Sequence, residues 1–412
     1  MKKTLFILLA LFFTLRAEAI TLSLKIFPTD YVLLLDEKPL SPYKTLENIR
    51  YYDLPYGKYE LILRAPGYYD KRINIKLIKP TYIEDKLYRT ASRLSLIGEY
   101  PTGSQPKSVS FSPDGHYLYV ALLDDNGVDI FNGQDFSYIK RAEVPKQFAL
   151  EKGFVESAIV NGLLWISQMT TGRIHIFDLY GNYLYTSDRT GVWPKVICPD
   201  RKGKIIYISN WESRDIAVMD ALTGRLISSI KVSGIPRGMS ISQDNKYLYV
   251  CNYEKGLIEK IDTEKKEVIK TIDNGFGARR HIVMDRYGEF AYISDMYKGT
   301  IAKLELKTDK ILLEKYIGPK LNTIDISSDG KFLFVSSRGH NNPETYLKKG
   351  PDFGRVYVLD TSDLSIVDWV WGRNQPTGLA ISPDDKFLVF SDFLDGNIEV
   401  YDISRLWNDL SD

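Results

Sequence analysis

One strand pattern recurs along the chain from about residue 93 onward. It consists of an apolar residue, an aromatic or apolar pair, a small residue and then, in most copies, Asn or Asp. The seven copies are Tyr119-Val120-Ala121, Trp165-Ile166-Ser167, Tyr207-Ile208-Ser209-Asn210, Tyr249-Val250-Cys251-Asn252, Tyr292-Ile293-Ser294-Asp295, Phe334-Val335-Ser336 and Val389-Phe390-Ser391-Asp392. They are spaced by 46, 42, 42, 43, 42 and 55 residues. A unit of this length that holds four short strands has the size of one propeller blade. The pattern therefore predicts an all-β chain with a seven-bladed β-propeller at 91–412.

The last copy contains too few strands for a complete blade. Leu379–Ser382, Lys386–Phe390 and Ile398–Asp402 are three strand-like runs, and the chain then ends within ten residues. The run 94–100, just before the first copy, has the character of an outermost strand. We expect it to pair with the last blade and close the ring, since closure removes an exposed sheet edge.

The region from residue 20 to about 90 is predicted to form a separate β domain. Its apolar residues come in short runs at 21–27, 31–35, 59–63 and 73–78, and turns rich in Pro and Gly separate these runs. No run in this region has the 3.6-residue period of a helix. A small β-sandwich is the expected fold.

Two family resemblances add to this interpretation. The repeated unit resembles the YVTN propellers, named for Tyr-Val-Thr-Asn. The region 20–90 resembles the PEGA domain through Leu54-Pro55-Tyr56-Gly57 and Ala65-Pro66-Gly67-Tyr68, although Pro28-Thr29-Asp30-Tyr31 stands where that family has Pro-Glu-Gly-Ala. The PEGA resemblance implies a small surface or periplasmic β-sandwich without a catalytic role.

The first nineteen residues are typical of a secretory signal. Lys2 and Lys3 precede the apolar run 5–13, and Ala17-Glu18-Ala19 has the small residues of a cleavage site. The apolar run is shorter than the ~20 residues that span a bilayer. We therefore expect residues 1–19 to be a signal peptide and the mature chain to be secreted across the inner membrane, to the periplasm or the cell surface. No later segment is apolar enough to be a transmembrane helix.

Composition narrows the chemistry. The chain has 54 Lys and Arg against 53 Asp and Glu, which argues against a nucleic-acid partner. Two Cys and four His are too few for several zinc sites, an iron–sulfur cluster or a disulfide scaffold. No catalytic set is recognisable in the sequence, and no metal or cofactor is predicted.

The predicted binding site is a set of cations at the entries to the inner strands. In five copies a Pro is followed by a basic residue; the fifth blade has Arg279-Arg280-His281 instead, and in the seventh Arg373 precedes the strand. The five bases that follow Pro are Lys107, Lys146, Lys195, Arg237 and Lys320. Ring closure would bring these cations together at one mouth of the channel, with Trp193 and Trp211 beside them for stacking.

Converging cations repel one another and need compensation. An internal source would be Glu212, Glu254 and Asp295 in neighbouring loops; an external source would be an anionic ligand, such as an acidic glycan, a carboxylate or an acidic loop of a protein partner. The insertion 338–354, which accounts for the spacing of 55 residues, is a second candidate for binding or simply a tolerated surface loop.

Two functions from different classes fit this sequence. The first is an exported, non-enzymatic propeller that binds a partner or serves as a scaffold in the cell envelope. The alternative is a hydrolase that resembles the propeller lactonases, some of which hold Ca²⁺ in the channel through acidic and amide side chains. The residues in position for that role are Asn210, Glu212, Asn252, Glu254, Asp295, Asp392 and Asp395.

Overall fold

The computed structural model describes residues 19–149, 151–272 and 275–408. The chain divides into two compact units, Met1–Thr90 and Ala91–Asp412. The predicted signal peptide lies outside the described residues except for Ala19. In the part of the chain that the structure describes, the only helices are α1 (Lys146–Ala149) and the 3₁₀ turn η1 (Ser404–Leu406), and neither is long enough to cross a membrane.

The first unit is a pair of four-stranded sheets that share one apolar core. Leu22, Leu24, Tyr52, Leu61 and Leu63 are buried in that core. One sheet has the order β4 (Lys44–Leu46), β5 (Ile49–Pro55), β1 (Ala19–Phe27), β8 (Thr81–Lys86). The other has the order β3 (Lys38–Leu40), β2 (Val32–Leu35), β6 (Gly57–Arg64), β7 (Lys71–Leu77).

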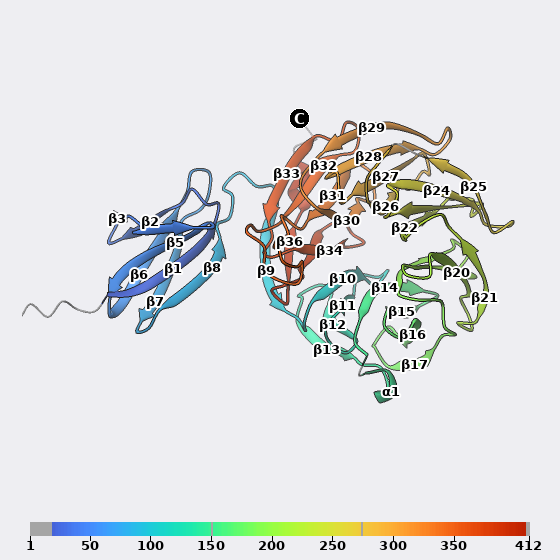
Figure 1. The fold of residues 1–412 in the computed structure, drawn as a ribbon, viewed down its shortest axis with the longest axis horizontal. Coiled ribbons are helices and arrows are strands. Elements are labelled where there is room, and N and C mark those ends of the chain that lie inside the picture. The colour runs from blue at the N-terminus through green and yellow to red at the C-terminus, as the bar shows by residue number, and fades with distance from the viewer. Residues whose placement is uncertain (1–18, 150, 273–274, 409–412) are drawn as a thin grey trace, which may run out of the picture. The chain divides into compact units, whose positions relative to one another are not determined.

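The second unit is a seven-bladed β-propeller, in agreement with the predicted fold class (Figure 1). Blades one to three are β10 (Pro106–Phe111), β11 (Tyr117–Leu122), β12 (Val128–Asn132), β13 (Tyr138–Ala142); β14 (Phe154–Val160), β15 (Leu163–Gln168), β16 (Arg173–Asp178), β17 (Tyr183–Thr186); and β18 (Pro194–Pro199), β19 (Ile205–Asn210), β20 (Asp215–Asp220), β21 (Leu226–Lys231). Blades four and five are β22 (Pro236–Ile241), β23 (Tyr247–Asn252), β24 (Leu257–Asp262), β25 (Glu267–Ile272); and β26 (Arg279–Met284), β27 (Phe290–Asp295), β28 (Thr300–Glu305), β29 (Lys310–Tyr316). Blades six and seven are β30 (Leu321–Ile326), β31 (Phe332–Ser337), β32 (Arg355–Asp360), β33 (Ile366–Trp371); and β34 (Pro376–Ile381), β35 (Phe387–Asp392), β36 (Asn397–Asp402), β9 (Ser95–Pro101).

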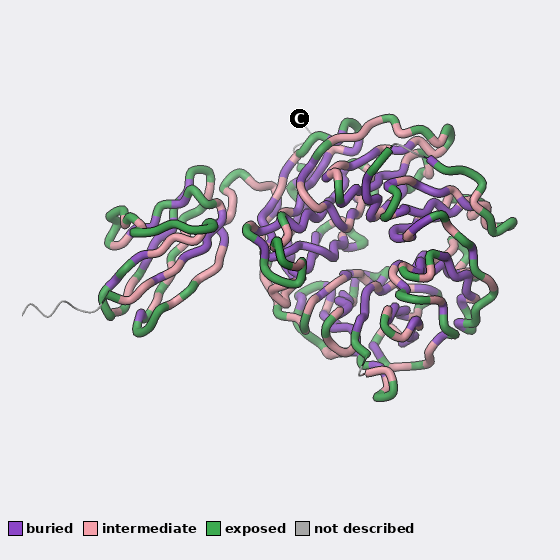
Figure 2. The backbone as a smooth tube through the Cα atoms, viewed as in Figure 1, coloured by how far each residue is buried: buried purple, intermediate pink, exposed green. Residues whose placement is uncertain are grey.

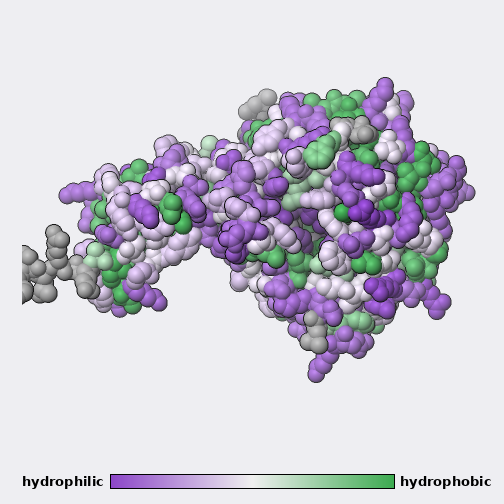
Figure 3. All heavy atoms as spheres, in the orientation of Figure 1, coloured by the Kyte–Doolittle hydropathy of each residue, from purple (hydrophilic) through white to green (hydrophobic). Residues whose placement is uncertain are grey.

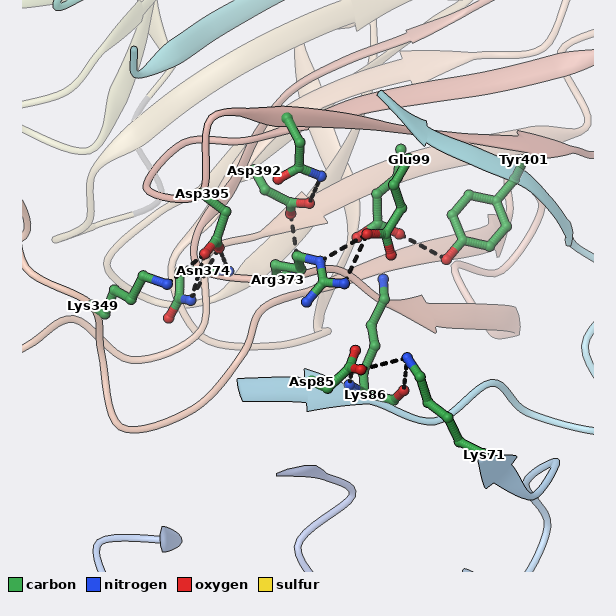
Figure 4. Close-up of polar contacts among 12 residues, drawn as sticks. Lys71, Asp85, Lys86, Glu99, Lys349, Arg373, Asn374, Asp392, Asp395 and Tyr401 are labelled. Carbon is green, nitrogen blue, oxygen red and sulfur yellow. Dashed lines mark hydrogen bonds and ion pairs between the residues drawn. The ribbon is translucent and has the colours of Figure 1, made fainter. Parts of the chain in front are cut away.

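The seventh blade takes its outer strand from the start of the unit. β9 pairs antiparallel with β36, from Ser95 opposite Asp402 to Pro101 opposite Asn397. Glu99 on β9 also accepts hydrogen bonds from Arg373, whose Nη2 lies 2.7 Å from Glu99 Oε2 (Figure 4). The inner strands β34 and β10 contact each other, so the blades form a closed ring.

The propeller core lies between neighbouring blades, and Figure 2 shows the buried residues along the inner and middle strands. Leu118, Val120, Val389 and Val400, for example, belong to one cluster shared by the first and seventh blades. The repeated Ser and Asp residues are turn caps: the Ser242 hydroxyl donates to Asp244, and the Tyr247 amide donates to Ser242 Oγ. Repetition of these residues therefore reflects turn geometry rather than chemistry.

Candidate anion-binding cavity

The register of the blades defines two sets of equivalent positions, each with one residue per blade, at the end of the inner strands where the second strands finish. In every blade the first residue of the inner strand pairs with the last residue of the second strand, as Pro194 does with Asn210, and the ladder is interrupted directly afterwards. Such bulges re-aim the side chain that follows. The second residues of the inner strands form the first ring: Lys107, Val155, Lys195, Arg237, Arg280, Asn322 and Thr377. We call these residues the inner ring.

The residue that follows each second strand forms the second ring. In sequence these residues take the position directly after the recurring small-residue and Asn or Asp motif. They are Leu123, Met169, Trp211, Tyr253, Met296, Arg338 and Phe393, and we call them the rim. Six of the seven are apolar or aromatic, so the rim differs sharply in character from the inner ring.

A cavity of about 350 Å³ lies where the two rings meet. Figure 3 shows a hollow in the propeller with hydrophobic and hydrophilic side chains around it. Its cationic lining consists of Lys107, Lys195, Arg237, Arg280 and Arg338. Its other lining residues are Leu123, Met169, Trp193, Trp211, Tyr253, Met296, Asn341 and Tyr346. Among the described residues that line it, none is Asp or Glu.

The contacts of the cavity's lysines are with aromatic rings and a thioether, and not with the internal carboxylates that were one of the two predicted sources of compensation. Lys195 Nζ lies 2.9 Å from Met169 Sδ and within 6 Å of the ring centroids of Trp193 and Trp211. Lys107 Nζ lies 4.6 Å from the centroid of the Phe393 ring. These contacts stabilise a cation by about 0.5–2 kcal/mol each, which is less than a buried carboxylate partner can provide.

Two of the guanidinium groups keep hydrogen-bonding capacity unused. Arg237 and Arg338 are each only 6% exposed. Nε and Nη1 of Arg237, and Nε of Arg338, have no hydrogen-bond partner among the described residues, although Arg338 Nη2 donates to Gln375 Oε1. Leaving a buried charged donor unsatisfied is costly. Both side chains can therefore donate hydrogen bonds to an acceptor that enters the cavity.

Several titratable side chains in or near the cavity have pKa values shifted from their ordinary values. Burial lowers the pKa of Lys195 to about 7, with a further contribution from Arg237, and burial among other cations lowers the pKa of Lys107 well below its ordinary value. Burial raises the pKa of Glu156, on the inner strand β14, to about 7, although Arg237 and Lys107 oppose that shift. Burial lowers the pKa of His281, next to Arg280, to about 4.

The structure brings together some of the predicted site residues and separates others. Lys107, Lys195, Arg237, Arg280, Trp193 and Trp211 meet at the cavity. Lys146 does not enter an inner strand: it begins α1, which lies at the outer margin of the ring, and the inner strand of that blade starts at Phe154 (Figure 1). The prediction for Lys146 was wrong because Pro145 marks a helical turn and not a strand entry.

Four other predicted residues do not line this cavity. Lys320 precedes its inner strand with φ of 52°, so it matches Trp193 rather than Lys195, and it lines an adjoining cavity. Arg279 is fully buried and pairs with Asp295 and Glu314 at 3.7 and 3.2 Å. Arg373 pairs with Glu99. His281 does not line the cavity, although it lies close enough to Arg237 for that group to lower its pKa further.

The acidic residues offered for internal pairing or for calcium serve other partners. Asp295 pairs with Arg279 and accepts from the Ala278 amide, and Glu254 pairs with Arg214 at 3.1 Å. Asn210 donates to Asp215, and Asn252 donates to Glu259. Asp392 accepts from the Arg373 amide, Asp395 accepts from Asn374, and Glu212 is exposed (Figure 4). Across residues 19–149, 151–272 and 275–408, no group of three or more His, Cys, Asp or Glu could hold a metal ion.

The insertion 338–354 forms part of the cavity wall. Arg338, Asn341 and Tyr346 line the cavity, and Gln375 Nε2 donates to the Tyr346 carbonyl at 2.6 Å. Lys349 pairs with Asp395 at 2.6 Å, and Asp395 also holds Asn374 (Figure 4). These contacts fix the loop to the seventh blade, so the wall that it supplies is anchored on both sides.

Comparison with known proteins places the chain in a family. Residues 259–411 match the family described as "Lactonase, 7-bladed beta-propeller". Antigen Lp49 of Leptospira interrogans is 37% identical over 393 residues, which is 90% of this chain and 85% of that protein. The chain belongs to the antigen Lp49 family.

More distant relatives of this Lp49-family propeller share parts of it. A 6-phosphogluconolactonase of Formosa agariphila is 23% identical over 57% of this chain and 75% of its own length. A chain of the Kuenenia stuttgartiensis hydrazine synthase superposes with a TM-score of 0.61 at 18% identity, over 77% of this chain and 99% of that chain. The latter likeness shows the propeller fold alone.

Proposed function

We propose that this Lp49-family protein is an exported, non-enzymatic binding protein of the cell envelope, and that an anionic ligand binds in the cavity at the mouth of its channel. The ligand would be a carboxylate, an acidic glycan or an acidic segment of a protein partner. The proposal places the mature protein in the periplasm or at the cell surface, supported by the Lys2-Lys3 start and by the Ala17-Glu18-Ala19 site.

The convergence of five basic side chains on a cavity with no Asp or Glu in its described lining carries this proposal; Glu156, whose pKa burial raises to about 7, lies near Lys107 and Arg237 and offsets part of their charge. Like charges in one small cavity repel, and the unused donors of Arg237 add to the cost. An entering anion removes both costs, because it neutralises charge and accepts charge-assisted hydrogen bonds.

The test is titration calorimetry of the purified full chain with benzoate, inorganic phosphate and trigalacturonate in a buffer of low ionic strength. We expect at least one anion to bind, and Arg237→Met to weaken it at least tenfold. Lys146→Met is the matched control, because it removes a cation from α1 at the outer margin and should leave affinity unchanged. Equal affinity in wild type and Arg237→Met would exclude this cavity as the site.

A second function, lactone hydrolysis, is favoured by one observation. Glu156 lies on an inner strand near Lys107 and Arg237, and burial raises its pKa to about 7, the value suited to a general base at neutral pH. The partial match to the lactonase propellers is consistent with it. A pH-stat assay with glucono-δ-lactone and its 6-phosphate should then show turnover that Glu156→Gln abolishes; no turnover above the uncatalysed rate would leave binding as the function.

A further inference from the structure

The cavity presents two chemically distinct halves to whatever enters it. The inner ring supplies Lys107, Lys195, Arg237 and Arg280, whereas the rim and the entry loops supply the apolar and aromatic groups together with one further cation, Arg338. The apolar and aromatic groups are Leu123, Met169, Trp193, Trp211, Tyr253, Met296 and Tyr346. Thus one end of a ligand would meet charge and the rest would meet apolar surface.

We propose that the ligand is a small amphiphilic anion, in which a carboxylate or phosphate group is attached to an aromatic or aliphatic body. The anionic group would lie among Lys195, Arg237 and Arg280, and the body would pack against Trp211 and Met296. This inference rests on the proposed function, because it presupposes that the cavity binds an anion.

The lining favours such a ligand over an acidic sugar. A buried hydroxyl is costly unless it is hydrogen-bonded, and the proton of each sugar hydroxyl needs an acceptor such as a carboxylate or an amide oxygen. The described lining has no Asp or Glu, and its single amide side chain is Asn341. Methionine and aromatic side chains instead adapt to apolar bodies of different shape.

The size of the cavity favours a small molecule over a protein segment. Its volume of about 350 Å³ is at the low end of the ~300–1,000 Å³ that is usual for small-molecule sites. An acidic protein loop would need a broad complementary face in addition to this cavity. The cavity alone is large enough for a compact organic anion.

An adjoining cavity extends the apolar half outward. It measures about 330 Å³ and shares Trp211, Tyr253 and Met296 with the first. Phe276 and Tyr297 also line it; they are 69% and 62% exposed and meet edge to face with ring centroids 4.9 Å apart. A ligand with a longer body would therefore meet these rings together with the charged side chains of Glu254 and Lys320.

The experiment compares anions of equal charge and increasing apolar area. Calorimetry of the full chain with acetate, benzoate and 2-naphthoate should show affinity that rises at least tenfold from the first to the last, because burial of apolar area adds to a constant ionic term. Benzamide, a neutral counterpart of benzoate, should bind at least tenfold more weakly than benzoate. Galacturonate should bind no better than acetate.

Variants separate the two halves of the cavity. Trp211→Ala and Met296→Gln should flatten the dependence on body size and leave acetate affinity unchanged, whereas Arg237→Met should weaken all anions alike. Tyr287→Ala removes another exposed aromatic ring, away from the lining, and is the matched control. Met296→Gln keeps the test valid if Trp211→Ala does not fold.

Each outcome decides a different point. Equal affinity for acetate and naphthoate, or tighter binding of galacturonate, would overturn the amphiphilic ligand while leaving anion binding in place. A size dependence that survives both Trp211→Ala and Met296→Gln would also overturn it. Absence of binding by all of these anions would instead contradict the proposed function.

Discussion

At the scale of single residues, two buried arginines on adjacent blades have opposite surroundings. Arg279 is fully buried, and Asp295 and Glu314 both pair with it. Arg237 is almost as buried, yet two of its nitrogens find no acceptor. Burial by itself therefore does not distinguish a cation that stabilises the fold from a candidate for ligand binding. The number of N–H groups without an acceptor does.

This contrast gives a prediction about stability. Arg279→Met should destabilise the propeller by about 3–5 kcal/mol, since it leaves two carboxylates without their buried partner. Arg237→Met should leave the free energy of unfolding unchanged or raise it, because it removes an unsatisfied buried charge. Urea unfolding of both variants measures the difference. Equal destabilisation by the two substitutions would mean that Arg237 has a partner in the ligand-free protein.

The lowered pKa of Lys195 predicts that the protein takes up protons when an anion binds. The Lys195 pKa of about 7 means that the amine is largely neutral above that pH, and a bound anion would favour the charged form. Affinity should therefore fall as pH rises through 7 and level off below it. Deprotonation of Glu156 acts in the same direction, whereas Arg237, Arg280 and Arg338 stay charged.

Calorimetry in Tris and imidazole, two cationic buffers with different ionisation enthalpies, measures the protons taken up at pH 8. Lys195→Met should reduce that uptake, and Glu156→Gln should remove only the part that belongs to the carboxyl group. Lys107, whose pKa also lies well below its ordinary value, accounts for any remainder. An affinity that is constant from pH 6 to 9 in wild type would contradict the linkage.

At the scale of strands, the register in which the inner and second strands pair explains which sequence predictions were correct. The recurring strand motif was sufficient to predict the seven-bladed fold, because each copy lies on the second strand of a blade. The Pro-and-base motif was less reliable: Leu321, not Pro319, pairs with the end of its second strand, so Lys320 falls one residue early. In every blade the last residue of the second strand pairs with the first residue of the inner strand. Applied to Ser337 and Leu321, this rule places Asn322 in the inner ring.

The same count would have found the rim. Tyr253, Met296 and Arg338 follow the recurring motif as directly as Trp211 does, but of these four residues only Trp211 was predicted to lie at the mouth of the channel. The pairing of Arg279 with Glu314 was beyond the sequence, since Glu314 lies on the outer strand β29 and no local pattern connects them. Burial and ion pairing are tertiary properties that a repeat does not encode.

The pairing of β9 gives a prediction about how the stability of the ring depends on the first segment of the propeller. A chain that starts at Ala91 keeps β9 and should unfold in one cooperative transition with the melting temperature of the propeller in the full chain. A chain that starts at Thr102 loses the β9–β36 ladder and the Glu99–Arg373 pair, which exposes the edge of β36. It should melt at least several degrees lower, as calorimetry would show. Equal melting of the two chains would mean that closure contributes little.

At the scale of the whole molecule, a nearly neutral chain concentrates positive charge in one place. The formal net charge is +1, but five cations converge on one cavity. A cationic recess with low-dielectric walls focuses its field outward and raises the rate at which anions arrive. Because the overall charge is small, that attraction is local and should weaken strongly with added salt.

The one-residue-per-blade plan also has an evolutionary consequence. Each blade contributes a single side chain to the inner ring and a single side chain to the rim, as Lys195 and Trp211 do for the third blade. At the positions that line the cavity, a point substitution changes the lining without removing a backbone hydrogen bond of the strand ladder. Ligand preference can thus drift blade by blade while the scaffold persists, and relatives with the same fold need not recognise the same molecule.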